Sequence, residues 1–516
     1  MDTRPVIIGS SLNGLLVSHN LSRHNIDHIL IGGDRPLVQP RLGESMNEGA
    51  GLACWRMLDP KYRKFFYPKS HISLMHGDIA SMILVASPVR NQTSLASRLG
   101  DTSRRANLRT VVKGLCHLDR ANFDPVFYDD VIHHVRCCFV HNPSATVKFD
   151  YQSDRITSIQ VGDTTFNDPR YVFDTTGFRS VVAEAARIEI EPISNLERVA
   201  WTHFISDTAP ELRSAWWLNG TNLVRMDIQR DGMNGIAWLI PLGERISLGV
   251  SVSANQSQSV NLSGQELVDE LVEALLRRGI DLRKLYPQQE EVFELKHKYF
   301  ERKRAFGANW ILAGGTFRQF WFPTSSGVGV AMLAANLAPQ LLEQPLRFGK
   351  MYEQKVKGLR AFHELVDEMV RSEPFSEIDR TYEFWAAWTA GSFGRAHGDL
   401  RIANRDYDSR SYLRYQWIKN LGMMFQRHNW LQVMTVGAFT TSVERHQQTA
   451  DLSKSFRRYF QPAEFLWGNA IRALPRYLAN KLARLGHKMK GMKRQTPNSA
   501  EANIATVDSK SVSRAA

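Results

Sequence analysis

The N-terminal segment alternates apolar runs with polar turns in the order strand, helix, strand. Val6 to Ile8 form a short apolar run that leads into a turn bounded by Gly9 and Gly14. A helical pattern follows to about residue 24, and a second apolar run, 29–31, is closed by two glycines. A strand, a glycine-bounded turn, a helix and a strand in this order predict a βαβ unit with two parallel strands.

Downstream, the pattern changes twice. A helical segment with Val126 and Tyr128 is followed by several short apolar runs, which predict further strands of an α/β domain. Residues 195–300 instead alternate apolar and polar positions, which predicts an antiparallel sheet. Weak alternation also predicts strands within 67–88. The other expected strands are 146–149, 156–161, 171–173, 235–241, 246–252 and 310–313, and the expected helices are 95–114 and 328–342.

Length and composition add a few limits to this picture. The 516 residues, 43% of them hydrophobic, are too many for one core and predict two or three packed units. Four cysteines, no two of them spaced as CxxC, predict neither a disulfide framework nor a cysteine zinc site, and no metal is expected. There is no cleavable signal after Met1 and no apolar run of about 18 residues, so a cytoplasmic location without a spanning helix is expected.

The positive charge is concentrated near the C-terminus. The chain carries a net charge of +13, and 471–494 contains eight lysines and arginines and no acidic residue. Residues 465–494 therefore fit either a helix on an anionic membrane surface or a helix packed on the body with its basic side chains in water. No nucleic-acid-binding fold accompanies these residues, so nucleic acid is not an expected partner.

Several motifs carry more specific chemistry. Gly9, Ser11 and Gly14 follow the GxGxxG pattern with its middle glycine replaced, at a turn where backbone N–H groups and a helix N-terminus can bind a pyrophosphate. Three more segments follow in the chain. They are Leu118-Asp119-Arg120-Ala121-Asn122-Phe123-Asp124, Tyr171-Val172-Phe173-Asp174-Thr175-Thr176-Gly177-Phe178-Arg179-Ser180, and Asn309 to Gly315 with Pro323 to Gly329.

In this order, the four segments resemble the FAD-dependent superfamily of aromatic hydroxylases, flavin-dependent halogenases and lipid (geranylgeranyl) reductases. Arg41-Leu42-Gly43-Glu44-Ser45 is similar to the halogenase-like branch, although an ordinary polar loop is the alternative. The resemblance implies an α/β fold: a Rossmann-like FAD-binding domain with an inserted antiparallel β-rich substrate domain and a helical C-terminal extension. The implied boundaries are 1–50, 115–190 and 300–345 for the FAD-binding domain, 51–114 and 191–299 for the substrate domain, 346–490 for the helical region and 491–516 for a disordered tail.

The resemblance also implies which residues face FAD and substrate. The implied cofactor-binding positions are Gly9, Ser11, Gly14, Asp34, Arg41, Glu44, Arg120, Asp174, Gly177, Gly314, Gly315, Pro323, Gly327 and Val328. The implied substrate-pocket residues are Trp238, Trp321 and Phe322, with Trp216, Trp217 and Arg225 as further candidates and sheet packing as the alternative for each tryptophan. No catalytic side chain is assigned, because in such enzymes the flavin carries the difficult step.

Three positions depart from the family pattern. Ser11 replaces a glycine, Gly32 stands where an acidic residue usually binds the adenosine ribose, and Gly315 replaces the aspartate of a Gly-Asp pair. Asp34, in the following turn, is the nearest carboxylate that could substitute at the ribose. Each lost charge-assisted hydrogen bond weakens cofactor binding by about 1.5–3 kcal/mol.

The reaction class stays open between three functions. Halogenases direct their oxidant through a lysine downstream of the Gly-Glu pair, but the neighbourhood of His76 and Asp78 contains none. These two residues are themselves candidate acid/base groups, with a solvated turn as the alternative. We therefore expect a monooxygenase-like FAD-dependent oxidoreductase acting in biosynthesis on an organic, and in the membrane-bound case lipophilic, small molecule. A flavin-dependent halogenase and a non-catalytic binding protein on a flavoprotein scaffold are the alternatives. No second nucleotide fingerprint is present, so a separate flavin reductase is an expected partner.

Overall fold

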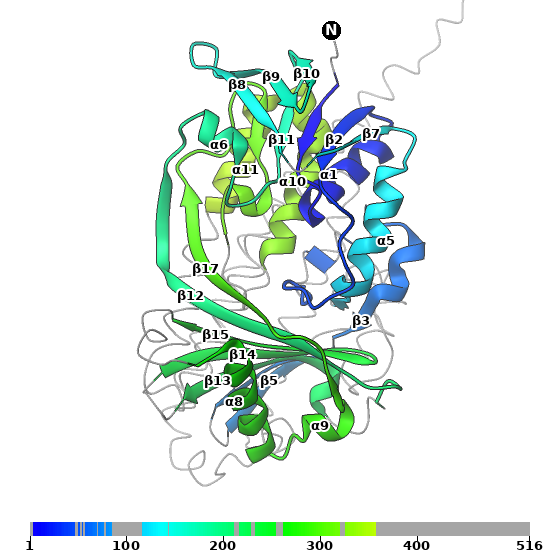
Figure 1. Cartoon of the computed structure of the whole chain (residues 1–516), viewed down its shortest axis with the longest axis vertical. Coiled ribbons are helices and arrows are strands. Elements are labelled where there is room, and N and C mark those ends of the chain that lie inside the picture. Colours follow the sequence, from blue (N-terminus) through cyan, green and yellow to red (C-terminus); the bar gives the residue numbers. More distant parts are fainter. Residues whose placement is uncertain are drawn as a thin grey trace, which may run out of the picture.

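The computed structural model describes residues 4–46, 50–51, 54, 57–69, 71–76, 79–84, 116–142, 144–210, 216–228, 233–253, 262–319 and 326–357. These residues form two lobes, which two long strands connect along one side of the molecule (Figure 1). The predicted helix at 95–114, the basic segment 465–494 and the tail 491–516 lie outside the described residues.

The first lobe is built on a parallel sheet. Each strand is a short, mostly apolar run, and four of the five are buried along their whole length, as expected for a sheet that is covered on both faces. The strands follow the order β18-β11-β1-β2-β7. Their bounds are β1 (Val6–Ile8), β2 (His28–Gly32), β7 (Cys137–His141), β11 (Val172–Asp174) and β18 (Trp310–Leu312).

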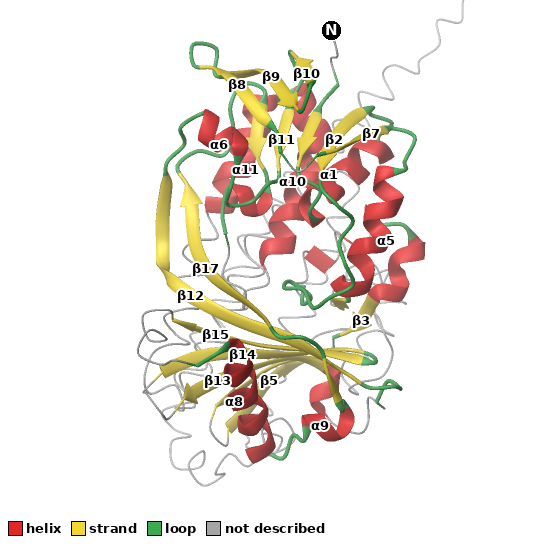
Figure 2. Cartoon of the chain, viewed as in Figure 1, coloured by secondary structure: helices red, strands yellow, loops and turns green. Residues whose placement is uncertain are grey.

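Helices cover this parallel sheet, and two of them, α1 and α10, pack against each other. Helix α1 contacts α10 directly, since Asn20 Nδ2 donates to the Ala335 carbonyl at 2.7 Å. A small antiparallel sheet lies above (Figure 2). The helices are α1 (Leu12–Arg23), α5 (Arg120–Ile132), α6 (Val181–Ala185), α10 (Ser326–Glu343) and α11 (Pro345–Lys357), and the small sheet contains β8 (Thr146–Asp150), β9 (Arg155–Val161) and β10 (Thr164–Asn167).

The second lobe is an eight-stranded, mostly antiparallel sheet with the path β16-β12-β15-β14-β13-β4-β5, and β17 pairs with β12. Only the β13–β4 pair is parallel among the described strands of this sheet. Its strands are β4 (His71–His76), β5 (Ile79–Leu84), β12 (Ile190–Ile205), β13 (Gly220–Ile228), β14 (Met233–Leu242), β15 (Arg245–Ser253), β16 (Gln288–Gln289) and β17 (Phe293–Arg302). Strands β3 (Phe66–Pro68) and β6 (Cys116–Leu118) form a short antiparallel pair. In the sequence, β3 comes directly before β4 and β6 follows β5.

The two faces of this large sheet differ in chemistry. Alternate residues such as Val224, Leu239 and Val250 pack under α8 (Gly264–Arg277) in one apolar cluster. Because neighbouring side chains of a strand point to opposite faces, Thr221 and Trp238 lie on the other face, which turns toward the first lobe. The sheet therefore offers a polar and aromatic surface to the first lobe.

Most of the longer elements agree with the sequence pattern, and β7 and α8 are among those that were not predicted. Strand β7 is partly exposed along its length, although Cys137 to Val140 are apolar. Helix α8 lies inside the region that was predicted to be antiparallel sheet. It does carry a sequence signal, because Ser263 and Glu266 form a complete capping box.

None of the helices that the structure describes is long and apolar enough to cross a bilayer. Within the same residues, no cluster of side chains has the composition of a metal site. The division of the chain into domains with the predicted boundaries stays a prediction.

Candidate functional site

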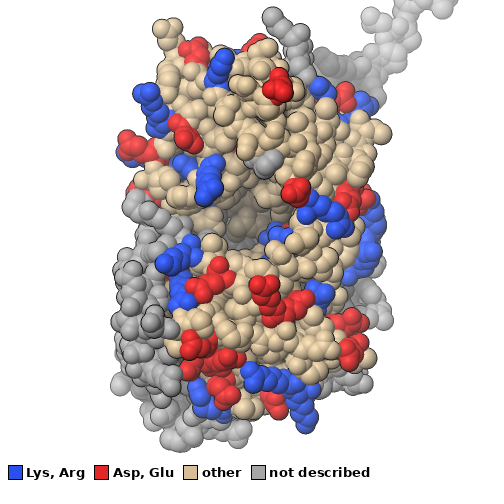
Figure 3. Space-filling model, viewed as in Figure 1, with Lys and Arg blue, Asp and Glu red and all other residues tan. Residues whose placement is uncertain are grey.

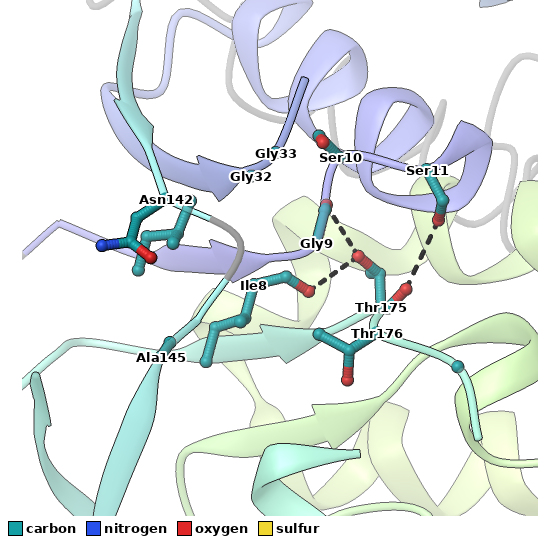
Figure 4. A pocket seen from close by; sticks show the side chains of 12 residues that line it. Ile8, Gly9, Ser10, Ser11, Gly32, Gly33, Asn142, Ala145, Thr175 and Thr176 are labelled. Atoms are coloured by element: carbon teal, nitrogen blue, oxygen red, sulfur yellow. Dashed lines mark hydrogen bonds between the residues drawn. The ribbon is translucent and has the colours of Figure 1, made fainter. Parts of the chain in front are cut away.

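A pocket of about 370 Å³ opens at the carboxyl ends of the parallel strands. Its walls come from the turn after β1, the end of β2 and the turn after β11, which approach one another at this edge of the sheet (Figure 4). The lining residues are Ile8, Gly9, Ser10, Ser11, Ile31, Gly32, Gly33, Asn142, Ala145, Thr175, Thr176 and Gly177. In open α/β sheets, nucleotides bind at this edge.

Two glycines make the turn after β1 possible. Gly9 has φ +108°, and a Cβ at Gly14 would stand only 1.9 Å from the Gly9 carbonyl oxygen. The Thr175 hydroxyl fills the space that remains, since it donates to the carbonyls of Ile8 at 2.8 Å and Gly9 at 2.9 Å (Figure 4). The turn is therefore fixed against the strand end of β11.

The N-terminus of α1 points its backbone at this pocket. Ser11 occupies the N-cap position but makes no side-chain cap; its hydroxyl donates to the Thr175 carbonyl at 3.4 Å. The first N–H groups of the helix are thus left for another acceptor, and a helix N-terminus favours an anion such as a pyrophosphate.

The end of β2 carries no acidic side chain, and the structure shows a steric reason why Gly32 stands there. A Cβ at Gly32 would lie 2.3 Å from Ser10 Cβ and 2.4 Å from Ser10 Oγ, so the serine side chain fills the position where an acidic side chain would begin. Asp34 does not line the pocket: its side chain is 94% exposed and pairs with His141 at 2.8 Å. Asp34 is thus not among the residues that line this pocket, and a role at the ribose stays a prediction.

Asp174 acts on the turn after β11 rather than on the pocket surface. Its buried carboxylate accepts hydrogen bonds from the Thr176 N–H and hydroxyl, the Ser180 hydroxyl and the Val182 N–H at 2.6–2.9 Å. These four donors fold the turn that brings Thr176 and Gly177 to the pocket wall. Asp174 therefore positions the turn from behind.

The Gly314-Gly315 pair lies beside α1. Gly314 has φ +58°, and a Cβ there would meet Asn13 Nδ2 at 2.5 Å, while Asn13 Nδ2 donates to the Ala313 carbonyl at 2.7 Å. Gly315 is less restricted, because the nearest atom to a Cβ would be Gln319 Oε1 at 3.4 Å. The structure thus leaves room for a side chain where the family pattern has an aspartate.

A second cluster contains the Arg41–Glu44 loop. Arg120 donates to the Leu42 carbonyl and binds Asp124 at 2.6 Å, and Arg41 Nε lies 3.7 Å from the same carboxylate. Burial lowers the pKa of Arg41, and Asp124 partly offsets this effect. Val328 is close to this loop, at 3.9 Å from a Cβ at Gly43, so the loop is held between α5 and the start of α10.

The residues present fit FAD at the adenylate end. The backbone of the glycine turn and the uncapped α1 N-terminus can hold a diphosphate, although none of the described residues that line the pocket is acidic. Gly327 at the start of α10 has open space around its Cα. Pro323, Trp321, Phe322 and Asp78 lie outside the described residues, as do the side chains of Trp216 and His76.

The inner face of the large sheet holds the remaining candidates. Trp238 is buried, donates from Nε1 to Ser247 Oγ at 3.1 Å, and covers Gly249, where a Cβ would lie 2.2 Å from its ring. Its indole is thus tied into the sheet on the face that meets the first lobe. Trp217 belongs to the apolar cluster under α8, so it packs in the core, and Arg225 is buried on the inner face.

Glu44 joins the two lobes through a buried histidine. His203 Nε2 lies 3.0 and 3.3 Å from the two Glu44 carboxylate oxygens, and its Nδ1 is 3.2 Å from Glu290 in an ion pair that lacks hydrogen-bond angles. Arg245 approaches Glu290 at 3.9 Å. Burial lowers the pKa of His203, but the two carboxylates outweigh it and raise the pKa to about 9. Glu44 is therefore neutralised by an imidazolium, and the sequence did not show this partner.

Sequence reading also missed a buried lysine. Lys69 is 3% exposed and donates to Ser45 Oγ and to the Met46 carbonyl, each at 3.1 Å. It precedes the 76–80 neighbourhood that was searched for a lysine after the Gly-Glu pair. The bend between β3 and β4 brings it against the same Gly43-Glu44-Ser45 loop, a contact that a fixed sequence offset does not reveal.

Comparison with solved structures identifies the fold. A variant of the halogenase PltM in complex with FAD superimposes with a TM-score of 0.57 at 13% identity, over 79% of this chain and 84% of that one. The flavin-dependent halogenase CmlS gives a TM-score of 0.54 at 15% identity, over 82% of this chain and 78% of that one. PqsL, a probable FAD-dependent monooxygenase from Pseudomonas aeruginosa, gives 0.53 at 15% identity, over 75% of this chain and 99% of that one.

Sequence comparison adds no closer relative. No protein-family model matches the chain, and no curated protein matches its sequence. At the identities above, the likeness is one of fold. The chain therefore has the fold of FAD-dependent halogenases and monooxygenases, which confirms the resemblance that its motifs suggested.

Proposed function

We propose that the protein is an FAD-dependent oxidoreductase that acts on an organic small molecule. The pocket at the ends of β1, β2 and β11 carries this proposal, because its walls are glycine backbone, hydroxyl groups and the N-terminus of α1. These are the groups that bind a dinucleotide diphosphate in a βαβ fold. The fold shared with FAD-dependent enzymes supports the same cofactor.

Within this proposal, Gly9, Ser11, Thr176 and Gly177 hold the adenylate half of FAD. Arg41, in the loop beside Val328, and Arg120, at the start of α5, would face another part of the cofactor. Bound FAD supplies oxygen activation and electron transfer. The face seen in Figure 3 is hollowed between the two lobes, and a substrate bound in this hollow would be partly shielded from water.

A monooxygenase-like reaction is the first form of this proposal. The absorbance spectrum of the full chain, incubated with FAD and then freed of unbound FAD, tests the cofactor assignment. Bands of oxidised flavin that stay with the protein are expected. A folded protein that never retains flavin would favour the alternative, a binding protein on a flavoprotein scaffold.

Halogenation is the second candidate, and Lys69 favours it. The sequence argued against a halogenase because no lysine was found in the expected neighbourhood after the Gly-Glu pair. In the structure, the buried amine of Lys69 lies beside the Gly43-Glu44-Ser45 loop. With FAD, a flavin reductase, oxygen and bromide, the wild-type chain should brominate an activated diketone trap. The Lys69→Met variant should lose this activity, while Lys61→Met, which removes a surface lysine, should keep it. Oxygen uptake without bromination in the wild type would return the assignment to the monooxygenase.

Two further parts of the proposal concern partners. A separate flavin reductase would supply electrons, because the sequence contains one nucleotide fingerprint. Binding of 465–494 to anionic membranes would favour a lipophilic substrate. Sedimentation of the full chain with anionic vesicles, compared with neutral ones, tests that contact.

A further inference from the structure

The end of β2 differs from the other walls of the pocket, because a side chain from the neighbouring turn fills it. A Cβ at Gly32 would lie 2.3 Å from Ser10 Cβ and 2.4 Å from Ser10 Oγ. In a βαβ nucleotide fold, an acidic residue at this position commonly accepts a hydrogen bond from the adenosine ribose. The Ser10 hydroxyl therefore occupies the space in which such a side chain would begin, and Ser10 lines the pocket (Figure 4).

The oxygen atoms around this strand end already accept hydrogen bonds from within the protein. The Gly32 carbonyl accepts from the Asn142 N–H at 2.8 Å. The Gly33 carbonyl accepts from the Tyr128 hydroxyl at 2.7 Å, and Asn142 Oδ1 accepts from the Ser144 N–H at 2.8 Å. A ribose hydroxyl that donates toward this strand end thus meets oxygen atoms that are already in use. A serine hydroxyl, in contrast, can both donate and accept.

The carboxylate nearest in the sequence lies outside the pocket wall. The side chain of Asp34 is 94% exposed and pairs with His141 at 2.8 Å. Arg35, the next residue, is paired with Asp129 of α5 at 2.8 Å. None of the described residues that line the pocket is acidic. An anion on the ribose would therefore meet a neutral hydroxyl, close to the start of α1, where the helix dipole favours negative charge.

We infer that Ser10 takes the place of the acidic residue at the adenosine ribose, so that the pocket admits a nucleotide with a 2′-phosphate as readily as one with a 2′-hydroxyl. A carboxylate at this place would repel a 2′-phosphate, because two anions would stand side by side. A hydroxyl donates to a phosphate oxygen and accepts from a ribose hydroxyl. Ser10 is thus a specificity-determining residue. This inference rests on the proposed function, because the pocket must first hold an adenine nucleotide.

Two ligands that differ only at the 2′ position test the inference. ADP-ribose and ADP-ribose 2′-phosphate are each titrated into the full chain, and their dissociation constants are measured by isothermal calorimetry. The wild type should bind the phosphorylated ligand no more than about threefold more weakly than ADP-ribose. Ser10→Ala should weaken the binding of ADP-ribose by about two- to tenfold, the usual effect of one neutral hydrogen bond. Ser153→Ala removes an exposed serine hydroxyl from the turn between β8 and β9 and should leave both affinities unchanged.

A carboxylate can also be restored to the end of β2. Ser10→Gly removes the side chain that blocks it, and Gly32→Asp in the same chain adds the acid. This double variant should bind ADP-ribose 2′-phosphate at least about tenfold more weakly than ADP-ribose. Its matched control, Ser10→Gly with Gly32→Asn, has the same shape without the charge and should bind the two ligands equally. Near-ultraviolet circular dichroism reports folding of the variants, and the wild-type comparison needs none of them.

Two results would overturn the inference. The first is a wild type that prefers ADP-ribose by more than about threefold. If Asp34→Asn removes that preference, Asp34 is the residue at the ribose. The second is a Ser10→Ala variant that binds ADP-ribose like the wild type.

Flavin absorbance of the same protein after incubation with FAD separates this inference from the proposed function. Equal binding of the two ligands by a chain that retains no flavin would reject the proposed function alone. Retained flavin with exclusion of the 2′-phosphate would reject the inference alone. A folded chain that binds neither ligand and no flavin would reject both.

Discussion

The buried contact between His203 and Glu44 predicts a measurable pH dependence of stability. His203 is fully buried between Glu44 and Glu290, and each carboxylate needs a donor. Replacing His203 by glutamine leaves Glu44 buried without a cation. Loss of one partner of a buried ion pair costs about 3–5 kcal/mol, so the His203→Gln variant should be less stable than the wild type by this amount at pH 7.

The pKa of His203 gives an independent magnitude and a direction. A rise from the ordinary 6.5 to about 9 corresponds to about 3 kcal/mol. Because the folded-state pKa is raised, this stability is fully present below pH 6.5 and is lost as the pH rises through about 9. The stability difference between wild type and variant should therefore shrink between neutral pH and about pH 10.

Urea unfolding of both proteins across this pH range measures the difference directly. Groups that titrate in both proteins, such as Lys303, cancel when the two curves are subtracted. Glu44→Gln added to His203→Gln should recover part of the loss at pH 7, since the uncompensated charge is removed. Wild-type and His203→Gln curves that stay parallel from pH 6 to about 10 would refute the assignment of an imidazolium to this contact.

Substitutions at three further positions, one of them combined with Ser10→Gly, test the cofactor site. Gly315→Asp should strengthen FAD binding by up to about tenfold in a fluorescence titration, because only the flexible Gln319 amide stands near its Cβ; unchanged or weaker binding would contradict the space found there. Gly32→Glu alone should destabilise the chain by about 1–3 kcal/mol in thermal unfolding, since its Cβ meets Ser10. Adding Ser10→Gly should relieve that loss. If the two substitutions instead lower the stability additively, the clash is not the cause. Asp174→Ala should unfold at lower temperature and bind FAD more weakly, because it leaves four donors without their acceptor; normal binding would show that the turn holds without the carboxylate.

The βαβ unit was predictable because its information is local. A short apolar run, the glycines of the turn and a helical pattern lie next to one another in the chain, and β1, α1 and β2 form as that order predicts. The Trp310–Leu312 strand was likewise apparent as a short buried run. Helix α8 was missed because the alternating pattern around it dominated, although its capping box was present.

The contacts that give the candidate site its chemistry were not predictable in this way. Glu44 and His203 are separated by 159 positions, and nothing near either residue indicates its partner. The absence of an acid at Gly32 was visible, but its steric cause needs the position of Ser10 across the strand end. Asp174 was expected to face the cofactor because of its motif, whereas its four internal donors can be counted only in the folded turn.

Competition for FAD tests the central claim most directly, because the pocket at β1, β2 and β11 is assigned to the adenylate half of the cofactor. FAD is titrated into the full chain alone and with an excess of ADP or of riboflavin, and the bound fraction is followed by flavin fluorescence. ADP should displace FAD, and riboflavin, which lacks the diphosphate and adenosine, should compete poorly. FAD that does not bind, or that ADP fails to displace while riboflavin succeeds, would contradict the assignment of this pocket.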